Sequence, residues 1–222
     1  IMMFLSFQVM VVFLNQGMPA LSPSAADVSV TMGNTPLDRS LVEQISETEG
    51  VDKVFGRMEI AGLSVSSDVG EGTITLISYD DNQFGWAKKE LNEGSITPAV
   101  ENTDRVLVTY QNGINWKVGD TVVLHTPSGD KQVTVAGILE AATASAAGGA
   151  GSNGYMICSE QTFAALAGDS GYTTIDIQLS SAGGDDTVST IRSMIPSDST
   201  VSDRRITNSE SQSSYYTGAV FI

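Results

Sequence analysis

Residues 105–140 carry the densest alternation of strand and turn signals in this chain, and they favour a fold that contains an antiparallel sheet. Val106, Val108 and Tyr110 occupy alternate positions, and Val133 and Val135 repeat this spacing before Ile138. Turn-forming residues, including two Gly-Asp steps, separate the apolar runs at residues 117–120 and 127–130. Alternation with a period of two buries one face of a strand, and Gly, Pro and Asp favour tight turns. The segment therefore predicts a small antiparallel β unit.

Two strand–helix–strand patterns bracket the chain and predict an α+β fold. In each, a strictly alternating strand precedes an amphipathic helix, and a second strand follows. Pro36 and Asp38 suit the first turn of the first helix and Gly50 its end, while Pro196 ends the second. Paired halves of this kind commonly form a ferredoxin-like sandwich, with one sheet and its helices on one face. The two sets are residues 27–32, 36–49 and 51–65, and residues 174–179, 185–195 and 200–206.

Both ends of the sequence are apolar and predict contact with a membrane. Residues 1–18 contain no charged side chain, and the first charge comes at Asp27. We expect residues 1–25 to be part of a transmembrane helix and its stalk, since a spanning helix needs about 20 apolar residues. A cleaved signal peptide is the rival interpretation, because small residues at 24–26 suit a cleavage site. Residues 215–222 turn apolar behind two tyrosines and predict the start of another transmembrane helix.

The chain is strongly acidic, with 11 Lys and Arg against 26 Asp and Glu and a formal net charge of −15. Such a charge repels phosphate backbones, so it argues against a nucleic-acid partner. A solvated acidic exterior is also common among bacterial surface proteins, so the charge alone identifies no partner. The single cysteine, Cys158, rules out an internal disulfide, and its apolar neighbours predict a buried side chain.

The sequence carries no pattern typical of an active site. His125 is the only histidine, and no nucleophile motif such as G-x-S-x-G accompanies it. The carboxylate pairs at residues 80–81 and 185–186 do not fit a calcium-binding loop, so we interpret them as a turn and a helix cap. We therefore expect no catalytic, metal or cofactor site in this chain, and a secreted hydrolase is disfavoured.

Residues 141–154, with the sequence AATASAAGGAGSNG, lack apolar periodicity and predict a mobile loop. The loop is either a plain flexible connection or a contact surface for a partner protein or substrate, since loops displayed on a rigid lobe often carry function. The residues that we assign to such a contact are Ala147, Gly148, Gly149, Gly151, Ser152 and Asn153.

Two short stretches inside the hairpin-rich segment carry a resemblance to a known family. Residues 117–122, KVGDTV, and residues 135–139, VAGIL, resemble a GxKVGDxVxL…VxGIL pattern that recurs in the MacB-like extracytoplasmic domain of FtsX/MacB-type ABC transporter permeases. Residues 155–163 also follow the family's order of an apolar strand and then a short helix. The resemblance covers residues 26–216.

The resemblance implies a division of the chain into two lobes. Residues 26–104 and 172–214 would form a discontinuous porter-like α+β subdomain, which is the ferredoxin-like unit predicted from the two halves. Residues 105–171 would form an inserted, mainly β lobe of the kind called Sabre. The chain between the two apolar ends would be anchored in the cell membrane and would face its extracytoplasmic side.

The resemblance also implies partners and a mechanical function. Permeases of this family pair with a cytoplasmic ABC ATPase subunit, which binds the ATP, and they form homodimers or heterodimers. This chain would be non-catalytic and would couple ATP hydrolysis to export or mechanotransmission, with an extracytoplasmic protein or peptide as substrate. The alternative is a secreted or membrane-anchored extracellular binding module, whose first segment is only a signal or an anchor.

Overall fold

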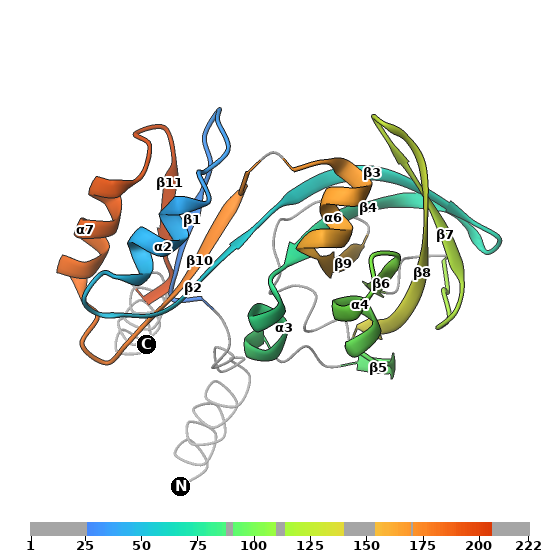
Figure 1. The fold of residues 1–222 in the computed structure, drawn as a ribbon, viewed down its shortest axis with the longest axis horizontal. Coiled ribbons are helices and arrows are strands. Elements are labelled where there is room, and N and C mark those ends of the chain that lie inside the picture. Colours follow the sequence, from blue (N-terminus) through green and yellow to red (C-terminus); the bar gives the residue numbers. More distant parts are fainter. Residues whose placement is uncertain (1–25, 88–90, 110–113, 140–153, 170, 206–222) are drawn as a thin grey trace, which may run out of the picture.

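The structure, a computed structural model, describes residues 26–87, 91–109, 114–139, 154–169 and 171–205. Its strands form two sheets with helices packed against them, so the predicted α+β class is confirmed (Figure 1). The smaller sheet and its helices come from the two ends of the described chain, and we name this part the chain-end lobe. The larger sheet and its helices form what we name the ring lobe.

The chain-end lobe contains a four-stranded antiparallel sheet with the strand order β11-β1-β10-β2. Two helices, α2 and α7, follow the first strand of each half. The elements are β1 (Val28–Thr31), α2 (Ser40–Ser46), β2 (Val51–Arg57), β10 (Thr174–Leu179), α7 (Asp185–Met194) and β11 (Thr200–Asp203).

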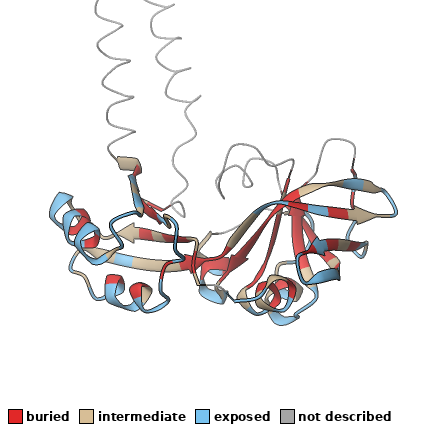
Figure 2. Cartoon of the chain, turned by 90° about the horizontal axis from the view of Figure 1, so that it is seen from above, coloured by how far each residue is buried: buried red, intermediate tan, exposed pale blue. Residues whose placement is uncertain are grey.

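Alternation along the central strands produces the core of the chain-end lobe. Ile175 and Ile177 of β10 are fully buried, and they join one cluster with Ile45 of α2 and Ile191 of α7. The intervening Asp176 points to the opposite face of the sheet. One face of the sheet is therefore covered by the two helices, whose outer sides are exposed (Figure 2).

The first helix is shorter than the amphipathic pattern predicted. The pattern covered residues 36–49, but α2 begins at Ser40 and ends at Ser46. Leu37 instead forms a bridge with Tyr172, donating its N–H at 2.7 Å and accepting the N–H of Tyr172 at 3.0 Å. A backbone that exchanges both hydrogen bonds with a neighbouring segment is held extended and cannot join the helix.

The ring lobe contains a seven-stranded sheet with the strand order β5-β8-β6-β9-β4-β3-β7, and β7 also pairs with β8. This last pairing closes β3, β4, β9, β6, β8 and β7 into a ring, and β5 adds to the free edge of β8. The strands are β3 (Glu59–Ser67), β4 (Gly70–Tyr79), β5 (Leu91–Gly94), β6 (Arg105–Thr109), β7 (Thr121–Thr126), β8 (Gly129–Leu139) and β9 (Tyr155–Ser159). The helices are α3 (Asp81–Ala87), α4 (Thr97–Glu101) and α6 (Glu160–Ala167).

The ring strands β6 and β9 are buried on both faces, whereas β3 and β7 alternate between buried and exposed residues. Val106 and Val108 of β6 belong to one cluster, whereas Leu107 between them belongs to a second cluster that includes residues of α3 and α4. Cys158 of β9 lies in the first cluster and is fully buried, as its apolar neighbours predicted. Burial raises the pKa of its thiol, so the thiol stays protonated and unreactive.

The two sheets divide the chain differently from the predicted lobes. The prediction placed residues 59–104 with the chain ends and residues 105–171 in the insertion. β3, β4 and β5 instead pair with β6 to β9, so the second sheet begins at Glu59 and extends to Ser159. The predicted strand at residues 51–65 is likewise two strands, β2 and β3, which lie in different sheets. The division into two sheets depends on pairing between segments that are distant in sequence, such as β4 with β9. Such pairing produces no local pattern in the sequence from which it could be predicted.

None of the helices in the described ranges is long and apolar enough to cross a bilayer. The predicted membrane segments, residues 1–25 and 215–222, lie outside the described residues.

Candidate functional site

The chain crosses between the two lobes at two places, and the first crossing is a single residue. Met58 alone separates β2 from β3, and its side chain is 1% exposed. Its N–H donates to Ser78 Oγ at 2.8 Å, and its carbonyl accepts the N–H of Ser78 at 2.9 Å. A strand of the chain-end lobe therefore continues into the ring lobe without a flexible loop.

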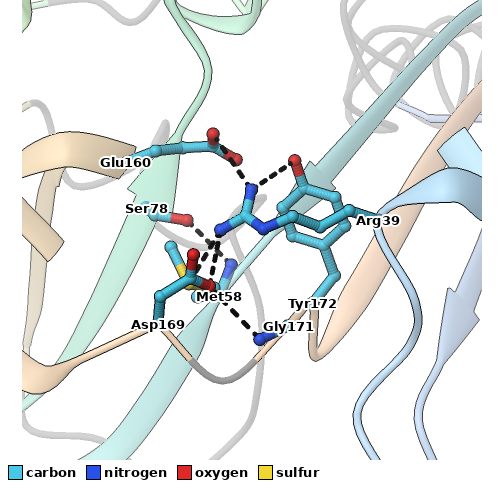
Figure 3. Close-up of polar contacts among 7 residues, drawn as sticks. All are labelled: Arg39, Met58, Ser78, Glu160, Asp169, Gly171 and Tyr172. Atoms are coloured by element: carbon cyan, nitrogen blue, oxygen red, sulfur yellow. Dashed lines mark hydrogen bonds and ion pairs between the residues drawn. The ribbon is translucent and has the colours of Figure 1, made fainter. Parts of the chain in front are cut away.

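The second crossing follows α6 and is held by a cluster of four residues that we name the junction clamp: Arg39, Glu160, Asp169 and Tyr172 (Figure 3). The Arg39 guanidinium donates to Asp169 Oδ1 at 2.8 Å, to Tyr172 Oη at 3.0 Å and to Glu160 Oε2 at 3.4 Å. Arg39 belongs to the chain-end lobe and Glu160 opens α6 of the ring lobe. The clamp thus joins the two lobes through one cation.

Stacking fixes the position of the Arg39 side chain. Its guanidinium carbon lies 4.6 Å from the centroid of the Tyr172 ring, a cation–π contact. The Tyr172 ring also lies against Gly56 of β2, where an added Cβ would lie 2.1 Å from Tyr172 Cε2. Only glycine leaves room for the ring at this place. Tyr172 therefore contacts both a strand backbone and a cation.

The electrostatics of the junction clamp follow from these contacts. The Arg39 hydrogen bond holds the pKa of Asp169 below its usual range. Partial burial, followed by the hydrogen bond of its hydroxyl to Glu160, raises the pKa of Tyr172 to about 12. Burial lowers the pKa of Arg39, but the contacts with Asp169, Tyr172 and Glu160 outweigh this and raise it. The side chains of Arg39 and Asp169 are 39% and 54% exposed, so water and salt screen this ion pair and its contribution to stability is small.

A second network lies beside the first crossing and is more deeply buried. Arg57 at the end of β2 contacts Glu59 Oε2 at 2.6 Å and Asp176 Oδ2 at 2.9 Å, and Ser29 Oγ donates to Asp176 Oδ1 at 2.9 Å. The Arg57 side chain is only 10% exposed. Burial lowers its pKa, but the charges of Asp176 and Glu59 outweigh burial and keep it raised. This network connects three strands of the chain-end sheet to the first residue of β3.

A third contact between the lobes is aromatic. Trp86 of α3 donates its ring N–H to Gln178 Oε1 of β10 at 2.7 Å. Its ring also packs on Phe55 of β2, with centroids 5.2 Å apart and an interplanar angle of 30°. With Met58, the junction clamp and the Arg57 network, it gives the lobes several independent points of contact.

The two ends of the described chain leave the chain-end lobe side by side. β1 and β11 are antiparallel neighbours, with Val28 opposite Asp203, and the N–H of Arg204 donates to the carbonyl of Asp27 at 2.9 Å. The Arg205 guanidinium then donates two hydrogen bonds to the Asp203 carboxylate, at 2.7 and 3.1 Å, and lies 3.6 Å from Asp185 of α7. The exit point is therefore fixed to both the sheet and a helix.

His125, the only histidine in the sequence, lies beside a serine and an aspartate. His125 Nε2 lies 3.0 Å from Ser66 Oγ, and His125 Nδ1 lies 2.8 Å from Asp130 Oδ1, which is the order of a catalytic triad. However, β3 is paired with both β4 and β7 at Ser66, so the nearby backbone N–H groups are used by the sheet and cannot stabilise an oxyanion. The imidazole is also 42% exposed. This geometry gives no support for acyl transfer.

The carboxylate pairs lie at the starts of two helices. Asp80 Oδ1 accepts the N–H of Asn82 at 2.8 Å beside the start of α3. Asp185 and Asp186 form the first turn of α7, but the N-cap of this helix is Gly184, so the predicted helix cap is wrong. No group of three acidic, His or Cys side chains close enough to hold a metal occurs in the described part of the chain. The residues assigned to a partner contact, 147–153, lie outside the described residues. The junction clamp was missed, because its members are far apart in sequence.

No family model matches the chain, and no curated protein matches it. The comparison with solved structures is informative. The periplasmic region of MacB from Actinobacillus actinomycetemcomitans superposes with a TM-score of 0.59 at 12% identity, covering 85% of this chain and 94% of that one. This chain has the MacB periplasmic fold.

A second solved structure is also similar to this chain. The extracellular domain of the noncanonic ABC-type transporter YknZ from Gram-positive bacteria has a TM-score of 0.54 at 11% identity, covering 78% of this chain and 99% of that one. The resemblance to MacB-like extracytoplasmic domains is confirmed at the level of the fold. The two matched domains are extracytoplasmic parts of transporters.

Proposed function

We propose that this chain is the non-catalytic extracytoplasmic domain of an ABC transporter permease subunit, and that it passes movement of its flanking membrane segments to the ring lobe. The observation that carries the proposal is the position of the two ends. They leave side by side from β1 and β11, while β2 and β10 of the same sheet lead directly into the ring lobe. A force applied at the exit point therefore reaches the ring lobe through one hydrogen-bonded sheet.

The finer architecture of the proposal follows the family. The strand order β11-β1-β10-β2 with α2 and α7 on one face supports a ferredoxin-like, porter-like assignment for the chain-end lobe. The ring lobe takes the place of the Sabre-like insertion, starting at Glu59. The contacts between the two lobes, at Met58, the junction clamp, the Arg57 network and Trp86, support a mechanical function, because lobes that are joined by several contacts move together.

The proposed partners are a cytoplasmic ABC ATPase subunit, which binds the ATP, and a second permease subunit, identical or related. The proposed location is the cell membrane, with this domain on the extracytoplasmic side. The fold shared with the MacB and YknZ domains supports this setting. A freestanding binding module is the second candidate, and nothing in the junction geometry favours it.

The test uses the full-length subunit, co-expressed with its ATPase. Cysteines replace the exposed Ser46 of the chain-end lobe and the exposed Asp68 of the ring lobe, since Cys158 is fully buried and stays unlabelled. We expect a membrane-impermeant maleimide to label both positions in intact cells. Spin labels there should keep their distance within one subunit during ATP hydrolysis, while distances between subunits change.

The control variant Arg39→Gln loosens the junction clamp and should broaden the distance distribution within a subunit. Failure of the maleimide to label, or distances between subunits that ignore ATP, would overturn the proposal. Release of the domain into the medium after cleavage near residue 25 would favour the binding module.

A further inference from the structure

A groove with a volume of about 690 Å³ runs between α2 and α7 on the outer side of the chain-end lobe. One side is formed by the end of α2 and the turn after it, with Thr48 and Glu49, and the other by the α7 stripe of Asp186, Thr190 and Met194. These α7 positions are four residues apart, so they share one face of the helix. The residues from 186 to 194 give the groove a length of about 12 Å at 1.5 Å per residue.

The groove combines negative charge with an exposed apolar side chain. Glu47, Glu49 and Asp186 line it, and no Lys or Arg does. Arg192 is two residues from Thr190 and therefore lies on the opposite side of α7. Met194 is 36% exposed, and it is one of only a few large apolar side chains exposed in the described chain. Methionine adapts to varied apolar partners, so it suits a binding surface.

The carboxylates are distributed along the groove. No three acidic, His or Cys side chains among the described residues converge on one point, so the spacing does not suit a bound metal ion. Separated carboxylates beside an apolar side chain match a polypeptide in which Lys or Arg residues alternate with apolar ones. Charge complementarity of this kind attracts and orients a partner segment.

The segments on either side of the described residues do not supply the positive charge. Residues 1–25 and 206–222 contain no Lys or Arg. A second copy of the chain carries the same net charge of −15, so its approach to an acidic groove is repelled. The occupant that these charges favour is a different polypeptide that carries positive charge.

We propose that the α2–α7 groove binds a cationic, amphipathic segment of a separate protein or peptide. This inference goes beyond the proposed function, because it concerns binding at the helices and not transmission through the junction. The Thr187 side chain, buried in the groove floor, donates to the Glu49 carbonyl at 3.1 Å and holds α7 against the end of α2. Binding needs no rearrangement of the fold.

The test measures fluorescence anisotropy of a labelled peptide with the 222-residue chain in a nonionic detergent. The probe is an amphipathic helix of Leu and Lys, about 14 residues or roughly four turns long. A counterpart with Glu in place of every Lys serves as the negative probe. We expect the Lys peptide to bind at about 20 mM NaCl and to weaken strongly toward about 300 mM, since salt screens exposed charges, and the Glu peptide not to bind.

Two variants with the same change in charge locate the site. The triple variant Glu47→Gln, Glu49→Gln, Asp186→Asn should lose about tenfold or more in affinity. The matched control Asp68→Asn, Glu71→Gln, Glu101→Gln removes three exposed carboxylates from the ring lobe and should stay within about twofold. Met194→Gln should weaken binding, because it removes the exposed apolar side chain and leaves the charge of the groove unchanged.

Four results would overturn the inference. The Lys peptide could fail to bind the unaltered chain, both triple variants could lose affinity equally, or calcium ions at low concentration could displace the peptide by binding the groove carboxylates themselves. A loss of peptide affinity in Arg39→Gln would also contradict the inference, because the junction clamp lies outside the groove. The proposed function could fail its own test while this binding persists, so the two failures are distinguishable.

Discussion

Replacing Arg57 by Met should destabilise the protein much more than the same replacement at an exposed arginine. The Arg57 guanidinium contacts Glu59 at 2.6 Å and Asp176 at 2.9 Å, and these carboxylates are 21% and 13% exposed. Met keeps most of the apolar stem but removes the charge and its hydrogen bonds. Two largely buried carboxylates then face each other across the first crossing without their counter-charge.

The magnitude follows from burial. Breaking a buried ion pair by removing one partner costs about 3–5 kcal/mol. Since both carboxylates keep some contact with water, we expect a smaller loss of about 2–4 kcal/mol in the free energy of unfolding. For a domain of this size that corresponds to a fall in Tm of roughly 5–15 °C. Loss of the network should also loosen β2 against β3.

The assay is urea unfolding followed by far-ultraviolet circular dichroism. Arg105→Met is the matched control, because Arg105 is 38% exposed and contacts Asp104 only at 3.5 Å, so its loss should cost at most about 1 kcal/mol. Adding Glu59→Gln and Asp176→Asn to Arg57→Met should recover part of the stability by removing the stranded charges. The reasoning is wrong if Arg57→Met and Arg105→Met unfold at the same urea concentration.

Three further outcomes are expected at the junction clamp. Gly56→Ala should lower the free energy of unfolding in urea by about 1–3 kcal/mol, because the added Cβ would overlap the Tyr172 ring. Adding Tyr172→Leu to this variant should recover part of the lost stability. If the effects of the two substitutions simply add, the contact is contradicted. The pKa of Asp169 is lowered in the folded state. The stability that the Asp169 carboxylate contributes is therefore present above the unfolded pKa of about 3.9 and is lost as pH falls through the folded pKa. Asp169→Asn should lack this pH-dependent loss when unfolding is measured from pH 6 to 2, and identical pH profiles for the two proteins would refute the prediction. The Tyr172 hydroxyl keeps its proton up to about pH 12 in the folded protein but ionises near pH 10 in the unfolded chain. The free energy of unfolding should therefore fall as pH rises from 10 to 12, and it should fall less in Tyr172→Phe. Unfolding measurements report the stability, and ultraviolet absorbance follows the ionisation of the tyrosine.

Local pattern predicted the elements of the fold better than their pairing. Alternation located β1, β10 and much of β6 to β8, since each buries one face or both. It could not assign β3 and β4 to the second sheet, because that assignment depends on β3 meeting β7 and β4 meeting β9, segments more than 50 residues apart along the chain. It also overestimated the first helix, because the bridge between Leu37 and Tyr172 holds the predicted first turn extended.

The junction clamp could not be predicted from the sequence, because it also depends on contacts between segments that are far apart along the chain. Arg39 and Tyr172 are separated by 133 positions, and neither stands in a recognised motif. The signal that existed was weak: Gly168 and Gly171, with φ of +87° and +86°, surround Asp169 and mark a tight connection at the second crossing. The partner-contact prediction at residues 147–153 concerned a different part of the chain and stays a prediction.

The single-residue step at Met58 gives the molecule a long lever arm. β2, Met58 and β3 occupy residues 51–67, a contour length of no more than about 55 Å at 3.3 Å per residue. If the whole segment turns as one body, a tilt of about 10° at the chain-end sheet displaces the far end of β3 by roughly 10 Å, given that strand length. Amplification of this kind converts a small rotation of the chain-end sheet into a stroke as wide as a helix.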